Sequence, residues 1–132
     1  MVYDENELQV IKDFYSIKKI KELVHQRHVY VVLNGNEIEA SAAVEPFEGN
    51  KEIAYISMVY SSPNKEGKGL GRIAIKAVEE DEYSKEAKMF RIHALLNSYR
   101  CYALAGYKYY QDTPQIINDK GVQAYILVKD KK

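Results

Sequence analysis

The stretch EGKGLGR, residues 66–72, decides how the chain is organised, because it holds three of the seven glycines among 132 residues. A glycine has no Cβ, so a ligand can approach the main-chain N–H groups directly. The apolar residues after this stretch recur at helical spacing, and they are Leu70, Ile73, Ala74, Ala77 and Val78. A helix N-terminus presents unpaired N–H donors and the positive end of the helix dipole. Lys65, Lys68 and Arg72 add positive charge, so the stretch predicts a phosphate site.

Two other phosphate motifs do not fit this spacing. The Walker pattern G-x-x-x-x-G-K-S/T requires Lys and then Ser or Thr after a glycine, and no glycine here is followed in this way. The Rossmann fingerprint G-x-G-x-x-G also fails, because Gly71 comes one residue too early after Gly67 and Gly69. The sequence therefore excludes a P-loop and a Rossmann dinucleotide site.

The remaining segments predict one α/β domain with a mixed sheet over residues 1–132. Apolar spacing over 5–25 predicts one or two helices. The Asn34-Gly35 dipeptide predicts a hairpin, and 52–62 predicts the third strand of an antiparallel set. Residues 89–96 predict a strand after the helix, and a strand–helix–strand unit implies parallel pairing. The last predicted elements are a helix over 98–105 and strands over 107–110 and 122–129, with 111–121 as a polar connection.

Composition limits the classes of function and partner. Lys and Arg number 19 and Asp and Glu also number 19, whereas a dedicated nucleic-acid binder normally carries a basic excess. No apolar run approaches the roughly 18–20 residues that span a membrane, and no secretory signal is visible. The single cysteine, Cys101, cannot form an intramolecular disulfide. We therefore expect a cytoplasmic protein with no metal, no nucleic-acid partner and no membrane contact.

Two motifs in this chain resemble those of the GCN5-related N-acetyltransferase (GNAT) superfamily. The first resembles V-x-P-x-x-R/Q-G-x-G-I/L-G/A and runs here from Ser61 to Arg72. The second resembles N-x(n)-Y-x-x-x-G-F/Y and is formed here by Asn97 and residues 102–107. The order of the predicted elements is similar to that family along nearly the whole chain. The resemblance implies a GNAT-like, mostly antiparallel central sheet with one parallel pair, flanked by helices.

The resemblance also implies an activity: an acyl-CoA-dependent N-acetyltransferase that moves an acetyl group from acetyl-CoA to a primary amine of a small molecule or peptide. Tyr102 matches the tyrosine that protonates the departing thiolate, although a packing role is the alternative in a chain with 12 tyrosines. A homodimer is an expectation on the same ground. The residues implied for coenzyme A are Gly67, Lys68, Gly69, Leu70, Gly71 and Arg72 at the pyrophosphate, Val59, Tyr60 and Ser61 along the pantetheine arm, and Asn97.

The general base is left open by the sequence. His93 lies on the strand after the glycine loop and its helix, near the place where some relatives keep an acidic base, and its near-neutral pKa suits that role. A strand histidine that is satisfied by a neighbour explains it equally well. Glu45, Glu52 and Tyr55 flank the second hairpin and are further candidates that would act through a water, although surface glutamates are the commoner explanation.

Departures from the family pattern support an alternative class, a non-catalytic acyl-CoA-binding or regulatory module. Glu66 stands where Arg or Gln is usual, Ser61 replaces a branched apolar residue, and the interval from Asn97 to Tyr102 is short. Other conspicuous side chains are predicted to be structural. Cys101 is expected to be a small buried residue, the acidic run 79–82 a solvated helix end, and the tyrosines at 99, 107, 109 and 110 packing residues.

Overall fold

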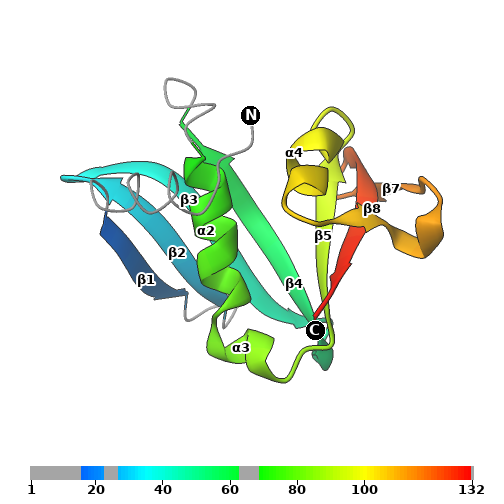
Figure 1. The fold of residues 1–132 in the computed structure, drawn as a ribbon, viewed down its shortest axis with the longest axis horizontal. Coiled ribbons are helices and arrows are strands. Elements are labelled where there is room, and N and C mark those ends of the chain that lie inside the picture. Colours follow the sequence, from blue (N-terminus) through cyan, green and yellow to red (C-terminus); the bar gives the residue numbers. More distant parts are fainter. Residues whose placement is uncertain (1–15, 23–26, 63–68, 132) are drawn as a thin grey trace.

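The computed structural model describes residues 16–22, 27–62 and 69–131 of the chain. Its strands form one mixed sheet in the order β1-β2-β3-β4-β5-β8-β6, with β7 paired to β8 (Figure 1). The elements are β1 Ser16–Glu22, β2 Arg27–Asn34, β3 Glu37–Phe47, β4 Asn50–Ser61, α2 Leu70–Glu79, α3 Glu82–Lys85, β5 Met89–Leu95, α4 Tyr99–Leu104, β6 Lys108–Tyr109, the 3-10 helix η2 Tyr110–Asp112, β7 Ile116–Asp119 and β8 Val122–Asp130. The predicted α/β class with a mixed sheet is confirmed.

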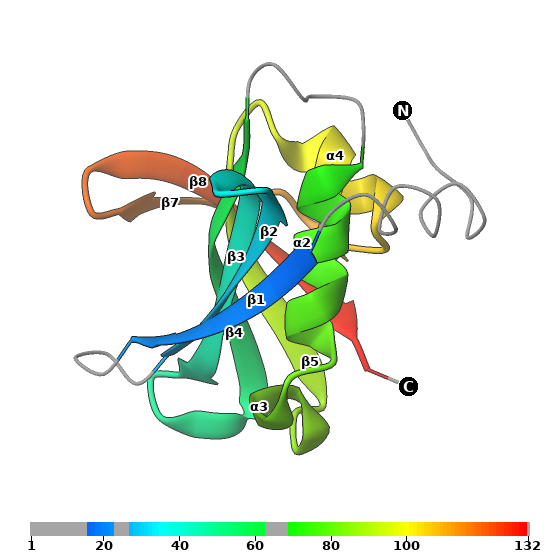
Figure 2. The ribbon, with the colours of Figure 1, turned by 90° about the vertical axis from the view of Figure 1, so that its left-hand side faces the viewer.

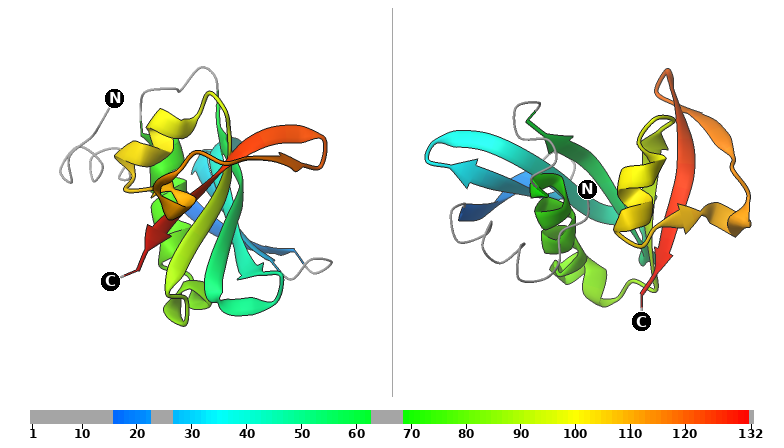
Figure 3. Two further views of the ribbon diagram at one scale, coloured as in Figure 1. Left: turned by 90° about the vertical axis from the view of Figure 1, so that its right-hand side faces the viewer. Right: turned by 45° about the horizontal axis from the view of Figure 1, so that its top comes forward.

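The described helices lie on one face of this sheet, with α2 crossing β2, β3 and β4 and α4 covering β5 (Figures 1 and 2). The predicted apolar stripe of α2 forms the core with the strands, since Leu70, Ala74 and Val78 are fully buried beside Val44 and Ile56. The opposite face carries no helix among the described residues. The β7–β8 hairpin extends away from the helices toward that open side (Figure 3).

The parallel pair β4–β5 is short, and this divides the sheet into two arms. The two strands pair only where Ile53–Ile56 meets Met89–Ile92. Beyond this ladder β4 stays paired with β3, while β5 pairs with β8 along its whole length. The two strands therefore part after Ile56 and Ile92, as Figure 1 shows. The β1–β4 arm and the β5–β8 arm diverge from this point.

A bulge in β4 lies where the strand leaves β5. The register with β3 shifts between Ser41, opposite Tyr60, and Ala43, opposite Ser57, so β4 contains one extra residue. Met58 has a positive φ of 53°, which is uncommon for a bulky residue. The Ser41 hydroxyl donates a 2.7 Å hydrogen bond to the Met58 carbonyl and holds this conformation. A bulge of this kind bends the strand away from its neighbour.

One side chain at the end of α2, Glu79, joins the two arms. Tyr107 follows α4 in the chain, and its hydroxyl donates a 2.7 Å hydrogen bond to Glu79 Oε2. Lys129 of β8 lies 3.1 Å from Glu79 Oε1. Because α2 packs on β2–β4 while Tyr107 and Lys129 belong to the other arm, these contacts tie the arms together below the point where they part.

The predicted helix over 5–25 is wrong where the structure describes it, because residues 16–22 form β1. Ile17 and Ile20 are three apart, as on a helix, but the segment pairs along its whole length with β2. Such tertiary pairing outweighs local spacing. Residues 5–15 and 23–25 of that prediction lie outside the described residues.

Two predictions in the C-terminal half also need correction. The connection 111–121 contains β7, whose Ile116 and Ile117 pair with β8. The strand over 107–110 is shorter than predicted and consists of Lys108 and Tyr109. The Asn34-Gly35 hairpin, the parallel pair and the helix within 98–105 are confirmed.

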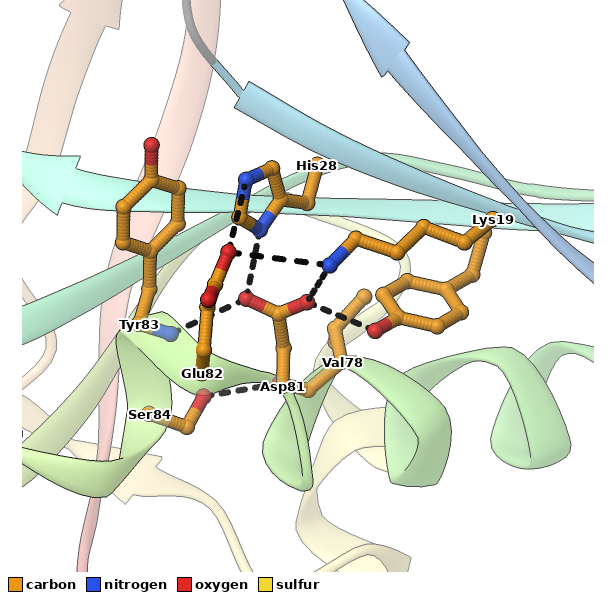
Figure 4. Close-up of polar contacts among 8 residues, drawn as sticks. Lys19, His28, Val78, Asp81, Glu82, Tyr83 and Ser84 are labelled. Atoms are coloured by element: carbon orange, nitrogen blue, oxygen red, sulfur yellow. Dashed lines mark hydrogen bonds and ion pairs between the residues drawn. The ribbon is translucent and has the colours of Figure 1, made fainter.

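Within the acidic run 79–82, Glu80 and Glu82 are exposed as predicted, but Asp81 is only 2% exposed. Figure 4 shows the contacts that surround Asp81. Its Oδ1 accepts a 2.6 Å hydrogen bond from Tyr30 and lies 3.2 Å from Lys19. Its Oδ2 lies 2.8 Å from His28 Nδ1 and accepts from the Tyr83 N–H. Burial alone would raise the pKa of Asp81, but these hydrogen bonds outweigh it and lower the pKa. Asp81 thus ties β1 and β2 to the start of α3.

Candidate functional site

The main-chain donors at the start of α2 form the first part of the site. Gly69 is the N-cap with φ 75°, a left-handed conformation that favours glycine, and no described side chain caps the helix. The Ile73 N–H donates to the Gly69 carbonyl at 3.1 Å, which is the first hydrogen bond of the helix. Such a terminus suits an anion. Gly67 and Lys68 lie outside the described residues.

The end of β4 lies beside this terminus. A Cβ on Gly71 would stand 3.7 Å from the Ser61 Cβ, which brings the first turn of α2 against Ser61. Val59 packs against the core and Tyr60 is 47% exposed. Leu70 is fully buried, so only its main chain can contact a ligand. Arg72, which is half-buried, follows in the same turn of α2.

Tyr102 on α4 supplies a hydroxyl on the helical face of the sheet. Its ring packs against the core and lies 6.3 Å from the Tyr107 ring. Burial, with a smaller contribution from Cys101, raises the pKa of Tyr102 to about 12. The hydroxyl has no hydrogen-bond partner among the described residues. Tyr102 therefore holds its proton at neutral pH and has no described acceptor for it.

The remaining predicted residues near α4 are exposed. Asn97 lies in the turn between β5 and α4, and its Oδ1 accepts a long 3.4 Å hydrogen bond from Ser98. Cys101 was expected to be buried, but it is exposed because α4 is short and buries none of its residues.

His93 lies on the opposite face of the sheet from Tyr102. Phe90, Ile92 and Ala94 of β5 point into the core beneath the helices, so the alternate residues Arg91 and His93 face the open side. His93 directly follows Ile92, the last residue that pairs with β4. Tyr102 thus lies on the helical side of the sheet, whereas His93 lies on the open side, next to the point where the strands part.

The ring nitrogens of His93 both have partners. Arg91 Nε donates a 2.9 Å hydrogen bond to Nε2. A guanidinium can only donate, so Nε2 accepts and the proton of the neutral ring sits on Nδ1. Nδ1 then donates to Asp119 Oδ2 at 3.1 Å, with the Tyr55 hydroxyl 3.4 Å away. Burial lowers the pKa of His93, with Asp119 opposing and Arg91 assisting, so the ring favours its neutral form at neutral pH.

The other candidate bases divide into two groups. Tyr55 belongs to the His93 network, and burial together with the Asp119 charge raises its pKa to about 12. Glu45 forms an ion pair with Arg27 at 3.3 Å, and Glu52 forms an exposed pair with Lys88 at 3.2 Å. Of these three candidates, only Tyr55 contacts His93 among the described residues.

Ser57 adds an unsatisfied group at the same place. It lies on the open face with Tyr55, because Ala54 and Ile56 of β4 point into the core. Its hydroxyl is buried without a hydrogen-bond partner among the described residues. A buried polar group without a partner is unfavourable and is often completed by a ligand or water. Ser57 therefore marks the open face of the parting point as a place for a polar ligand.

Sequence reasoning missed Arg91, Asp119, Phe47 and Ser57. The strand period places Arg91 on the same face as His93, and that signal was available in the predicted strand 89–96. Asp119 belongs to the unpredicted strand β7, and Phe47 reaches the Arg91 guanidinium from the β3–β4 hairpin at 4.2 Å.

The His, Cys, Asp and Glu side chains of the described residues form no group of three or more that could hold a metal ion. None of their helices combines the length and the apolar character needed to cross a membrane.

These features define an acetyltransferase fold, as comparisons with known proteins show. A GNAT family acetyltransferase from Elizabethkingia anophelis with acetyl-CoA bound matches with a TM-score of 0.67 and 17% identity, over 91% of this chain and 100% of that one. An IAA acetyltransferase from Bacillus cereus matches with a TM-score of 0.68 and 12% identity, over 89% and 99%. The N-acetylglutamate synthase of Neisseria gonorrhoeae, complexed with coenzyme A and N-acetyl-glutamate, matches at 0.61 and 14%, over 77% and 25%.

The family follows from the sequence match. The model of the acetyltransferase (GNAT) family matches residues 3–107, so the chain belongs to this family. A search of curated proteins finds no match. The family supports acyl-CoA-dependent acetyl transfer in general, which agrees with the resemblance noted in the two sequence motifs.

Proposed function

We propose that the protein is an N-acetyltransferase that moves the acetyl group of acetyl-CoA to a primary amine. The observation that carries this proposal is the start of α2, which no described side chain caps and which lies beside the end of β4, where β4 has parted from β5. Membership of the GNAT family and the acetyl-CoA bound to the E. anophelis neighbour support the choice of cosubstrate.

In this proposal the main chain holds acetyl-CoA, the substrate that supplies the acetyl group. The segment Gly67–Arg72 binds the pyrophosphate through its N–H groups. Asn97, in the turn between β5 and α4, contacts coenzyme A from the β5–β8 arm. Val59, Tyr60 and Ser61 contact the pantetheine arm, because beyond Ile56 the edge of β4 that faced β5 has no strand partner among the described residues. An unpaired strand edge offers main-chain donors and acceptors to an extended ligand.

Tyr102 and His93 are assigned as acid and base. A bond forms between the amine nitrogen and the acetyl carbon while the carbon–sulfur bond breaks. His93 takes the proton of the amine, and Tyr102 gives its proton to the departing thiolate. The two residues act from opposite faces of the sheet, which suits an amine that arrives on one side and a thiolate that leaves on the other. Asp119 stabilises the charged imidazole after the proton has been accepted.

The base role requires one exchange of hydrogen bonds. Arg91 Nε occupies the lone pair on His93 Nε2, so the amine must replace Arg91 there before the proton can move. This engaged nitrogen is also the observation that favours the second candidate, a non-catalytic acyl-CoA-binding module.

The test combines binding with turnover. Titration calorimetry with acetyl-CoA reports binding, and release of free thiol across a panel of primary amines reports transfer. Tyr102→Phe should lower kcat by about 100-fold or more with little change in acetyl-CoA affinity, since it removes only the proton donor. Tyr99→Phe is the matched control, because it removes another hydroxyl from α4 and keeps the ring stacked on Tyr109.

Each outcome separates the candidates. Absence of acetyl-CoA binding would overturn the proposal. Binding without thiol release from any amine would favour the non-catalytic module. An unchanged kcat in Tyr102→Phe would remove Tyr102 as the acid.

A further inference from the structure

We propose that Arg91 binds a carboxylate of the acceptor, so that the acceptor is an amino acid or a similar small molecule with its carboxylate close to the reacting amine. This inference rests on the proposed function, because it names the substrate class for the same site. It is carried by the contacts of Arg91 on the open face of the sheet.

Arg91 is held in place by neighbours that leave part of its guanidinium available. Its guanidinium lies 4.2 Å from the centre of the Phe47 ring and 6.0 Å from that of Tyr110. Its Nε donates to His93 Nε2 at 2.9 Å. A guanidinium fixed by stacking and by one hydrogen bond loses less conformational freedom when it binds a ligand. Arg91 is therefore organised before any ligand arrives.

The terminal amino groups of Arg91 have no partner among the described residues. No described carboxylate forms an ion pair with this guanidinium, whereas Arg27 on the same sheet is paired with Glu45 at 3.3 Å. These amino groups are not among the buried atoms without a partner, so they remain accessible to solvent. The planar pair of donors that they form matches the geometry of a carboxylate.

Two of the acidic residues nearby already contact other side chains. Asp119 pairs with His93, and Glu45 pairs with Arg27. Neither carboxylate forms an ion pair with Arg91, and Glu48, whose charge acts to raise the pKa of His93, forms none with it either. A carboxylate on the acceptor can therefore use the donors of Arg91, whereas a second cation would be repelled by it.

The position of Arg91 limits the size of the acceptor. Arg91 is in register with Tyr55, one pair before the β4–β5 ladder ends. His93 lies two residues further along the same face of β5, about 6.6 Å away between Cα atoms. A carboxylate on Arg91 would therefore hold an amine a few bonds away close to His93 Nε2. Those two contacts together replace the present Arg91–His93 hydrogen bond, which is the exchange that the base role requires.

Ser57 lies beside this position on the other strand. Parallel pairing would place it opposite His93 if the ladder continued by two residues beyond Tyr55 and Arg91. Its buried hydroxyl lacks a partner among the described residues, and it can accept from the amine or donate to the carboxylate. A carboxylate on Arg91 and an amine on His93, two residues apart on β5, favour a compact amino-carboxylate over a long polyamine.

The experiment measures thiol release from acetyl-CoA with each proteinogenic amino acid and with the carboxamide of the same amino acid. The two members of a pair differ in the carboxylate alone. For the best acceptor we expect kcat/KM to favour the carboxylate by about 10- to 100-fold, the range for a hydrogen-bonded charged group. Carboxamides that react as well as the amino acids would overturn the inference.

Variants assign the preference to Arg91. Arg91→Gln should remove the preference by lowering the rate with the carboxylate, and Arg91→Lys should keep part of it because the charge remains. Lys51→Gln is the charge-matched control, since Lys51 is exposed at the start of β4 and should keep the full preference. A preference that survives in a folded Arg91→Gln protein would overturn the inference.

A binding measurement keeps the inference testable if no amine is acetylated. Calorimetry then compares N-acetyl amino acids with their carboxamides on the protein saturated with coenzyme A. The same Arg91-dependent preference is expected, and equal or absent binding would overturn it. Failure of acetyl-CoA itself to bind would overturn the proposed function instead, so the two failures are distinguishable.

Discussion

Two histidine–aspartate pairs in the described part of the chain share a chemistry but not an environment. His28 Nδ1 lies 2.8 Å from Asp81 Oδ2, and both side chains are at most 5% exposed (Figure 4). His93 Nδ1 lies 3.1 Å from Asp119 Oδ2, and these side chains are 10% and 34% exposed. The first pair joins β1 and β2 to the α2–α3 corner. The second lies where β4 and β5 part.

The difference lies in how completely each carboxylate is satisfied. Asp81 receives contacts from Tyr30, Lys19, His28 and the Tyr83 N–H, so both oxygens are occupied by groups from three elements, β1, β2 and α3. Asp119 contacts His93 with one oxygen, interacts with the Tyr55 hydroxyl, and remains about one-third exposed. A closed network of hydrogen bonds stabilises one arrangement, whereas an open one can change its protonation or partners. The first pair is therefore structural, and the second is suited to chemistry.

The largest expected effect is on stability, from Asp81→Ala. Removing this carboxylate leaves His28, Tyr30 and Lys19 without their common partner. We expect the free energy of unfolding to fall by about 3–5 kcal/mol, as for a broken buried ion pair. Urea unfolding followed by circular dichroism measures this change. Asp119→Ala is the matched control and should cost less than about 1 kcal/mol.

Acid unfolding sharpens the same comparison. The folded state lowers the pKa of Asp81 below its ordinary value of 3.8, so its stabilisation is present above that pH and is lost as pH falls through the folded pKa. The variant without this carboxylate should lack that part of the acid dependence. An equal loss of stability in Asp81→Ala and Asp119→Ala would contradict the division into a structural and an open pair.

The next effect is on catalysis, from His93→Gln. If His93 is the base, its loss should lower kcat by about 100-fold. Because the pKa of His93 lies below 6.5, wild-type activity should fall as pH drops through that lowered value, when the ring becomes protonated. The variant should lose this limb of the pH profile. A profile that keeps the limb would show that His93 only holds Arg91 in place.

The sequence predicts features that depend on neighbouring residues better than it predicts the contacts of the two aspartates. The glycines of EGKGLGR and the motif Tyr102-x-x-x-Gly106-Tyr107 indicate local structure, because loop conformation and helix ends depend on nearby residues. They correctly predicted α2, α4 and the family. Both aspartates depend on distant contacts, since Asp81 meets a residue 53 positions away and Asp119 one 26 positions away.

Long-range pairing explains the other failures as well. Ser16–Glu22 has helical spacing and became a strand because β2 offered a full-length edge. No glycine in the sequence indicates the bulge at Met58, and the positive φ of Met58 is stabilised by a hydrogen bond from Ser41 of the neighbouring strand. The short strand β7 pairs only with β8, and through it Asp119 reaches His93. In each case the partner lies elsewhere in the chain, so the sequence of the segment alone does not predict the pairing.

A smaller effect is expected from Asp119→Asn, which keeps the size of the side chain and removes its charge. The charged form of His93 loses its stabilising carboxylate, so kcat should fall on the order of tenfold. Stability should change by less than about 1 kcal/mol because Asp119 is part-exposed. Thiol release and urea unfolding, measured on the same preparation, test both statements. A large loss of stability with unchanged kcat would make this pair structural like the first.

The smallest effect is expected from Glu52→Gln, which tests a carboxylate outside both pairs. Glu52 lies 3.2 Å from Lys88, but the two side chains are 62% and 78% exposed, so solvent screens their attraction. The free energy of unfolding should change by at most about 0.5 kcal/mol, and kcat should equal that of the wild type. Lys88→Gln is the matched control for the same ion pair. A tenfold loss of kcat in Glu52→Gln alone would give the base role to Glu52, and the open histidine–aspartate pair would then lose the chemical role that separates it from the buried one.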